Sequence, residues 1–205
     1  MQQGHGKSRR CSKTKGAVRR GGGLPRIWLM TDERVTEPDL LRSIERLPRG
    51  LAIVVRHYAL DDVARRGLFE RVRRVARRRG CITLLGGDPA QARAWGADGH
   101  HGRARMERGI GVCASPWLHS APVHDSREFV AALRAGADAI LLSPLMATRS
   151  HPGTRPLGAF RFAMLARRSP VPVIALGGVH PRHAGLVRQL GASGFAAIDG
   201  LIPRK

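Results

Sequence analysis

The 205-residue chain has little of several residue types, and each scarcity argues against a class of protein. Its three cysteines, Cys11, Cys81 and Cys113, are an odd number without metal-binding spacing, so neither a disulfide framework nor a zinc site is indicated. No run reaches the roughly 18 apolar residues of a membrane helix, and residues 1–15 lack the apolar centre of a signal peptide. We therefore expect a soluble, cytoplasmic protein that does not contact a membrane.

Acidic residues are also scarce. The chain has 15 Asp and Glu and 36 Lys and Arg, which gives a net charge of +21. Residues 1–26 hold three lysines, five arginines and no acid, with almost nothing apolar. Such a stretch cannot offset the entropy of ordering. We predict a basic disordered arm over residues 1–23 and one domain over 24–205. The arm is either a weak, nonspecific nucleic-acid-binding tail or a plain extension, including one from a start codon placed too early.

The other concentration of charge is a predicted amphipathic helix over residues 61–79. Its apolar residues fall on one face, and most of its arginines lie elsewhere. Arginine stems cover apolar surface while their charged heads stay in water, so this is interpreted as a solvated outer face. Only Phe69 is an aromatic neighbour, which argues against binding of single-stranded nucleic acid there.

From Arg26 onward, short apolar runs alternate with amphipathic stretches. The runs cover residues 27–31, 51–56, 81–85, 97–101, 118–124, 139–144, 171–176 and 194–198. Continuous apolar runs indicate strands of a parallel sheet that are buried on both faces. Eight strands with about seven helices predict a single (β/α)8 TIM barrel, and a doubly wound sheet is the alternative.

The sequence also indicates where several of the predicted helices begin. Thr36 with Asp39 opens one helix as a variant of the capping box. Ser126 precedes a helix over residues 127–135, and Pro181 lies in the first turn of another. Because the sequence stops soon after the eighth run, the barrel is expected to lack its last helix. The uncovered wall would favour a homodimer.

Two segments near the end of the chain suggest a site for a phosphate ester. The string VIALGGV (173–179) ends a strand in Gly177-Gly178, where bare amides and a helix start can approach an anion. With GFAAI (194–198) following, the pair resembles the phosphate site of the last two barrel strands. The long loop that begins at Ser143 offers hydroxyl groups and a cation for a polar ligand. The alternatives are a tight turn and a flexible surface loop.

From Ile27 to Leu201 the sequence resembles the thiamine-phosphate synthase and thiazole tautomerase (TenI) family. The likeness rests on the order and spacing of seven segments: IWLMTD (27–32), GADGHHG (96–102), VHDSRE (123–128), GAD (136–138), SPLMATRS (143–150), PLG (156–158) and ALGGV (175–179). The resemblance implies a TIM barrel of thiamine biosynthesis with thiazole phosphate as ligand. It places Thr148 and Ser150 near the thiazole, and Gly177, Gly178 and the Ile198 region at its phosphate.

The synthases of this family join the thiazole to a pyrimidine diphosphate with the help of Mg²⁺. The residues expected for that half-reaction are largely replaced. Gly86-Gly87 stand for Asn-Asp, leaving Asp88 as a weak Mg²⁺ candidate one place on, and Ala104-Arg105 stand for a second Asp. Pro122 replaces a Ser, His151 replaces a Lys, and of the second-strand motif only Arg56 is kept as a binding residue. No cofactor is expected, and Mg²⁺ only if synthase activity survives.

The residues that remain resemble a tautomerase more than a synthase. His124 matches the position of the tautomerase general base, and an imidazole that titrates near neutral pH suits that task. The alternative is a strand-end histidine with a structural role. His100, His101 and His151 form no convincing metal set, and Asp199 would repel a phosphate unless turned away.

Two further functions stay open. One is a divergent synthase that uses Asp88 and Arg105 as substitutes. The other is a non-catalytic barrel that binds a phosphorylated ligand or nucleic acid.

Overall fold

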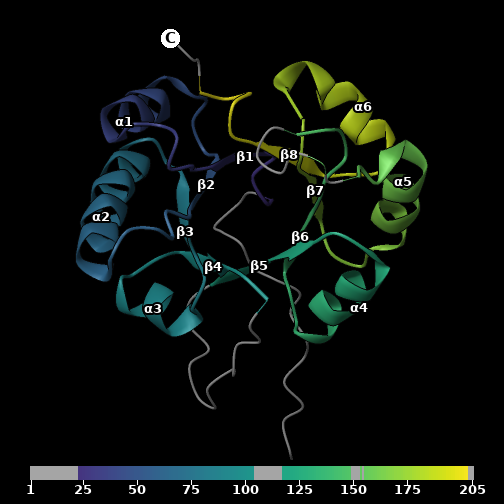
Figure 1. The fold of residues 1–205 in the computed structure, drawn as a ribbon, viewed down its shortest axis with the longest axis horizontal. Coiled ribbons are helices and arrows are strands. Elements are labelled where there is room, and N and C mark those ends of the chain that lie inside the picture. The colour runs from purple at the N-terminus through teal and green to yellow at the C-terminus, as the bar shows by residue number, and fades with distance from the viewer. Residues whose placement is uncertain (1–22, 104–116, 149–152, 154, 203–205) are drawn as a thin grey trace, which may run out of the picture.

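The structure, a computed structural model, describes residues 23–103, 117–148, 153 and 155–202. Eight parallel strands close into a barrel in chain order, with β8 bonded to β1, and the described helices surround it (Figure 1). The predicted TIM barrel is confirmed, and the doubly wound sheet is excluded because the sheet has no open edge.

The elements lie close to their predicted positions. The strands are β1 Ile27–Met30, β2 Ala52–Val55, β3 Ile82–Gly86, β4 Gly99–His101, β5 Leu118–Val123, β6 Ala139–Leu142, β7 Val173–Ala175 and β8 Gly194–Ala197. The helices are α1 Glu37–Arg46, α2 Asp62–Arg78, α3 Pro89–Ala94, α4 Ser126–Arg134, α5 Gly158–Arg168, the 3-10 turn η1 Pro181–His183 and α6 Ala184–Gln189.

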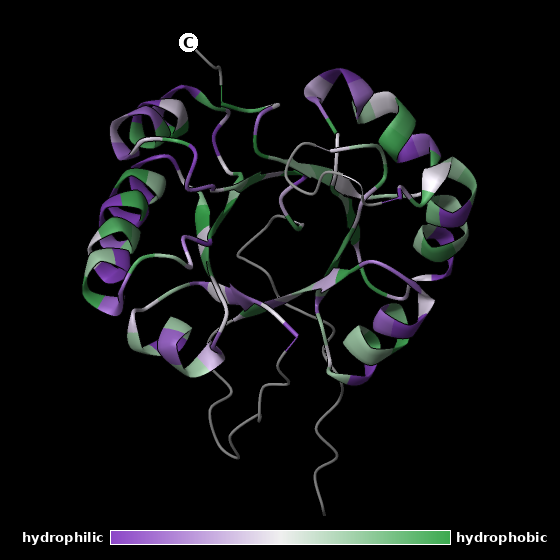
Figure 2. Ribbon diagram, viewed as in Figure 1, coloured by the Kyte–Doolittle hydropathy of each residue, from purple (hydrophilic) through white to green (hydrophobic). Residues whose placement is uncertain are grey.

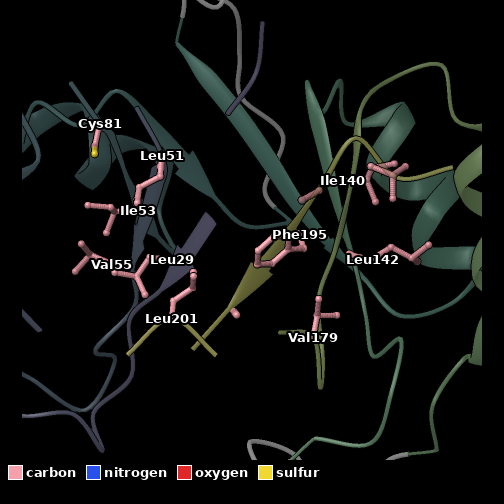
Figure 3. Close-up of a cluster of buried hydrophobic side chains, with 14 of the residues drawn as sticks. Leu29, Leu51, Ile53, Val55, Cys81, Ile140, Leu142, Val179, Phe195 and Leu201 are labelled. Carbon is pink, nitrogen blue, oxygen red and sulfur yellow. The ribbon is translucent and has the colours of Figure 1, made fainter. Parts of the chain in front are cut away.

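Alternate strand residues build two separate apolar layers. One layer contains strand residues such as Trp28, Val54 and Leu141, and it fills the barrel interior. The other joins the outward side chains of the strands to the helices, and Figure 3 shows Ile53 and Phe195 among its members. The strands are accordingly mostly green in Figure 2 and the helices are banded. Burial on both faces explains why the strands appear in the sequence as continuous apolar runs.

Helix starts follow local capping rules, with two corrections. The Thr36 hydroxyl accepts from the Asp39 N–H as predicted. Helix α4 begins at Ser126, and its cap is Asp125, whose carboxylate accepts from the Glu128 N–H. Pro181 opens the 3-10 turn η1 and not an α-helical turn, because α6 begins only at Ala184.

The outward side chains of β8, Phe195 and Ala197, are buried together with Leu201 and Ile202 of the segment that follows the strand. No helix follows β8 up to Ile202, in line with the expected lack of a last helix. The described residues do not include Cys11, Cys113, Ser150 or the basic arm up to residue 22, so the expectations for them stay predictions. The homodimer likewise stays a prediction. Among the described helices, none is long and apolar enough to cross a membrane.

A buried arginine fixes the carboxyl ends of β2 and β3. Arg65 of α2 donates from Nε to the Arg56 carbonyl at 2.8 Å and from a terminal nitrogen to the Gly86 carbonyl at 2.5 Å. It also reaches the side chain of Gln91 at 3.1 Å. Because each bond satisfies a carbonyl or amide at a strand or helix end, α2 sets the position of the mouth of the barrel on this side.

Candidate active site

A cavity of about 780 Å³ opens at the carboxyl ends of the strands. Active sites of this fold lie at that end, because the loops after the strands converge there. Six of the site residues expected from the sequence line this one cavity: Arg56, His124, Thr148, Gly177, Gly178 and Ile198. The structure thus brings them together, while their roles stay predictions. Ser150 falls outside the described residues, and Asp88 is not part of the cavity lining.

His124 is held by a carboxylate at the rim of the cavity. Its Nδ1 lies 2.8 Å from Glu128 Oε2, and its backbone N–H donates to the same oxygen at 2.8 Å. The other carboxylate oxygen accepts from Arg103 at 2.5 Å. A carboxylate at Nδ1 favours the tautomer with hydrogen on Nδ1, which leaves Nε2 as a proton acceptor. Arg103, Glu128 and His124 therefore form a chain that can orient a base.

The glycine pair follows β7 and packs against the loop after β6. Gly177 and Gly178 have φ of +90° and +66°, a region that glycine enters without strain. A Cβ on Gly177 would lie 2.6 Å from Pro144 Cα, and one on Gly178 would lie 2.9 Å from Met146 Cβ. Glycine is therefore required here for backbone conformation and for close approach of the two loops. The short η1 leaves little of the helix dipole that the sequence led us to expect.

Arg56 is anchored to the end of β1. Its Nε donates to the Thr31 carbonyl at 2.8 Å, and a terminal nitrogen lies 3.0 Å from Asp32 Oδ2. Burial opposes ionisation of Asp32, but hydrogen bonds from Arg34 and the charges of Arg34 and Arg56 outweigh it and lower the pKa of Asp32. The carboxylate thus stays ionised and keeps Arg56 in place at the cavity.

Asp199 also lines the cavity, where its charge was expected to repel a phosphate. Its Oδ2 lies 3.8 Å from a terminal nitrogen of Arg34, which offsets part of that charge. Three cationic or titratable residues of η1 and its flank also line the cavity and were missed from the sequence: His180, Arg182 and His183. The signal that could have found them is their position directly after the glycine pair.

His101 is a second imidazole of the cavity, and it is buried. Its Nδ1 lies 3.0 Å from Ser120 Oγ, whose hydroxyl donates to the His100 carbonyl at 3.3 Å. Ser120 must then accept from His101, so Nδ1 carries the hydrogen and Nε2 can accept. Burial, together with repulsion from Arg56, His100 and His119, lowers the pKa of His101 to about 3.

This buried neutral histidine predicts a pH dependence of stability. The folded pKa of about 3 lies below the ordinary 6.5, so the unfolded chain takes up the proton first. The stabilisation is complete above about pH 6.5 and falls as the pH drops toward 3, by up to about 1.4 kcal/mol per pH unit. Urea titrations of wild type and His101→Asn between about pH 7 and 5 should show a steeper loss in the wild type. Parallel curves would contradict the prediction.

The residues at the end of β3 do not fit the Mg²⁺ that the family resemblance implies. Gly86 and Gly87 offer no side-chain oxygen, and the Tyr58 hydroxyl occupies the space that a Cβ on Gly86 would need. Asp88 is exposed and accepts from the Ala90 N–H at 3.0 Å as the cap of α3. Within the described part of the chain, no group of three His, Cys, Asp or Glu could hold a metal.

Comparisons with known proteins agree with this fold. The family model described as thiamine monophosphate synthase (TMP-TENI) matches residues 27–201. A protein named putative thiamine-phosphate synthase 2 from Aquifex aeolicus is 28% identical over 180 residues, covering 86% of this chain and 97% of that protein. The thiamine-phosphate synthase of Salinispora arenicola is 31% identical over 193 residues, covering 87% and 89%.

Among solved structures, the thiamine phosphate pyrophosphorylase from Pyrococcus furiosus superposes with a TM-score of 0.70 at 20% identity over 88% of each chain, a likeness that shows the fold alone. The family model spans the whole barrel, from the first residue of β1 to just beyond β8. The chain therefore belongs to the thiamine monophosphate synthase family of thiamine biosynthesis.

Proposed function

We propose that this protein acts on thiazole phosphate as a tautomerase, moving a proton between two isomers of the ligand. The observation that carries the proposal is the His124–Glu128 pair, with 2.8 Å between Nδ1 and Oε2, because His124 lines the same cavity as the glycine pair. A base oriented by a carboxylate is the arrangement that proton abstraction requires. An isomerisation also needs no metal and no second substrate, in keeping with the residues at the end of β3.

In the proposed step, Nε2 of His124 takes a proton from a carbon of the thiazole system. The electron pair of the broken C–H bond moves into the ring, and the resulting negative charge is delocalised onto the ring heteroatoms. The imidazolium that forms is stabilised by the Glu128 carboxylate and returns the proton at a second carbon. One C–H bond breaks and another forms, so substrate and product have the same composition and no oxidant or reductant takes part.

The phosphate of the ligand would lie at Gly177, Gly178 and the start of the loop after β8. Glycine amides bind anions without steric hindrance from side chains. Arg182 adds positive charge at the same cavity, and the ion pair with Arg34 limits repulsion from Asp199. The thiazole would then extend toward Thr148 and His124.

A synthase is the second candidate, favoured by the names of the relatives. It would join thiazole phosphate to a pyrimidine diphosphate and would need Mg²⁺ to stabilise the departing diphosphate. Asp88 is the described carboxylate nearest to the family's metal position in sequence, but its carboxylate is used as the cap of α3. Arg105, the other proposed substitute, lies outside the described residues.

The experiment that separates the two candidates is incubation of the full chain with thiazole phosphate in D₂O, followed by proton NMR. A tautomerase should exchange the transferable proton for deuterium and produce the second isomer, with the same rate after addition of EDTA. Conversion that requires both Mg²⁺ and the pyrimidine diphosphate would replace the proposal with the synthase. Absence of either reaction, with no heat of binding on titration with thiazole phosphate, would overturn both.

A further inference from the structure

The end of the barrel opposite the cavity is strongly basic. Each of the six α-helices in the described residues carries arginine in its last turn, and all of these arginines are exposed: Arg46, Arg77, Arg78, Arg93, Arg134, Arg167, Arg168 and Arg188. The helices run antiparallel to the strands, so all their carboxyl ends lie at the amino ends of the strands (Figure 1). The arginines therefore surround one face, which we call the amino-terminal face.

Complementation of helix dipoles explains part of this pattern, since cations stabilise helix carboxyl ends. Arg49 follows the same rule, because it donates to the carbonyl of Arg78, the last residue of α2, at 3.1 Å. The rule does not explain Arg26, which lies at the same end, is exposed and belongs to no helix. The face thus has more positive charge than its helices need.

Carboxylates do little to balance this face. Among the described residues, three acidic side chains belong to it: Glu45, Asp98 and Asp138. Glu45 lies 3.6 Å from Arg78. The Asp98 and Asp138 carboxylates instead accept backbone N–H groups, from Thr83 at 2.8 Å and His119 at 2.9 Å. Most other described carboxylates lie at the cavity end, where the helices begin.

The described part of the chain begins at this same end, where Gly23 precedes β1. Residues 1–22 contain three lysines, four arginines and no acid, and they connect through Gly23 to β1 at this end. The exposed arginines of the face by themselves form a field that attracts an extended polyanion.

We propose that the amino-terminal face binds nucleic acid through its backbone phosphates, without reading bases. Arginine guanidinium groups pair with phosphate in a bidentate manner, and the barrel portion of this face uses arginine throughout. Base stacking is not offered, because Trp117 at this end is covered by Arg93 at 4.4 Å and by His100 at 5.0 Å. The exposed large apolar side chains lie on helix flanks or at the cavity end, which disfavours a membrane surface that would need apolar anchors.

The test uses the full chain and three arginines from the face. Arg46→Gln, Arg77→Gln and Arg188→Gln are combined in one variant. A matched variant combines Arg66→Gln, Arg127→Gln and Arg161→Gln, which remove the same charge from exposed positions nearer the cavity end. Binding to a fluorescent 20-base-pair DNA duplex is measured by anisotropy between about 50 and 200 mM NaCl. Over this range the affinity falls with salt in proportion to the number of phosphate contacts.

We expect the first variant to weaken binding at least about tenfold at the lowest salt and to reduce the salt slope by about 2 to 3. The matched variant should change affinity much less. Equal losses in both variants would mean that net charge alone is responsible, and an unchanged first variant would assign binding to residues 1–22; either result overturns the proposal. Tighter binding of the wild type to phosphatidylserine vesicles than to DNA, with the same arginine dependence, would also overturn it. Isomerase turnover is expected to be unchanged in both variants, so failure here is separable from failure of the proposed activity.

Discussion

Replacing His124 with alanine is expected to lower the turnover of thiazole phosphate by about 10²- to 10⁴-fold, the usual contribution of a general base. Affinity for the ligand should change little, because binding is assigned to the glycine pair and the loop after β6. Deuterium exchange followed by NMR gives the turnover, and calorimetric titration gives the affinity. Turnover equal to that of the wild type would remove His124 from the mechanism and make His101, the other imidazole with an accepting Nε2, the next candidate.

Glu128 supplies a sharper form of the same test, because it acts through His124 and does not itself reach the ligand. Glutamine keeps an acceptor for the His124 Nδ1–H but removes the negative charge that stabilises the imidazolium. Glu128→Gln should therefore reduce kcat, with KM nearly unchanged. Arg127→Gln, at an exposed neighbouring position, is the control. A loss of activity that comes from a raised KM, with kcat retained, would indicate that Glu128 has only a structural role.

The fold could be predicted from the sequence because both of its periodic signals are strong. Strands such as Ala52–Val55 are buried on both faces and therefore appear as unbroken apolar runs. Their limits were less certain, since Thr31 and His124 continue the pattern of β1 and β5 into the loops. The cap of α4 was misplaced by one residue because Asp125 and Ser126 are both good caps, and sequence alone does not choose between them.

The candidate site could be predicted only in part. Residues at the ends of strands meet at one mouth once the topology is known, which is why Arg56 and His124 share a cavity with Gly178. The contacts that tune the site come from residues distant in sequence. Asp199 meets Arg34 across the β1–β8 junction, and the Tyr58 hydroxyl fills the space beside Gly86. Such pairings depend on register and side-chain direction, which no local pattern specifies.

The second large effect is expected at Gly178. Gly178→Ala would place a β-carbon in a backbone conformation with φ +66°, against the Ala147 carbonyl and 2.9 Å from Met146 Cβ. We expect the free energy of unfolding to fall by roughly 2 kcal/mol, from left-handed strain plus the clash with the loop. The displaced loop should also weaken binding of thiazole phosphate at least about tenfold, since tenfold corresponds to only about 1.4 kcal/mol. Urea titration and calorimetry measure the two effects.

Gly185→Ala is the matched control, because Gly185 lies in α6 and a β-carbon there would meet no atom within 4 Å. Alanine in a helix should leave the stability unchanged or raise it by up to about 1 kcal/mol, with ligand affinity as in the wild type. If Gly178→Ala lost stability but bound thiazole phosphate normally, the glycine pair would be required only for the packing of two loops. The phosphate would then have to lie elsewhere in the cavity, and Arg182 would be the first residue to replace.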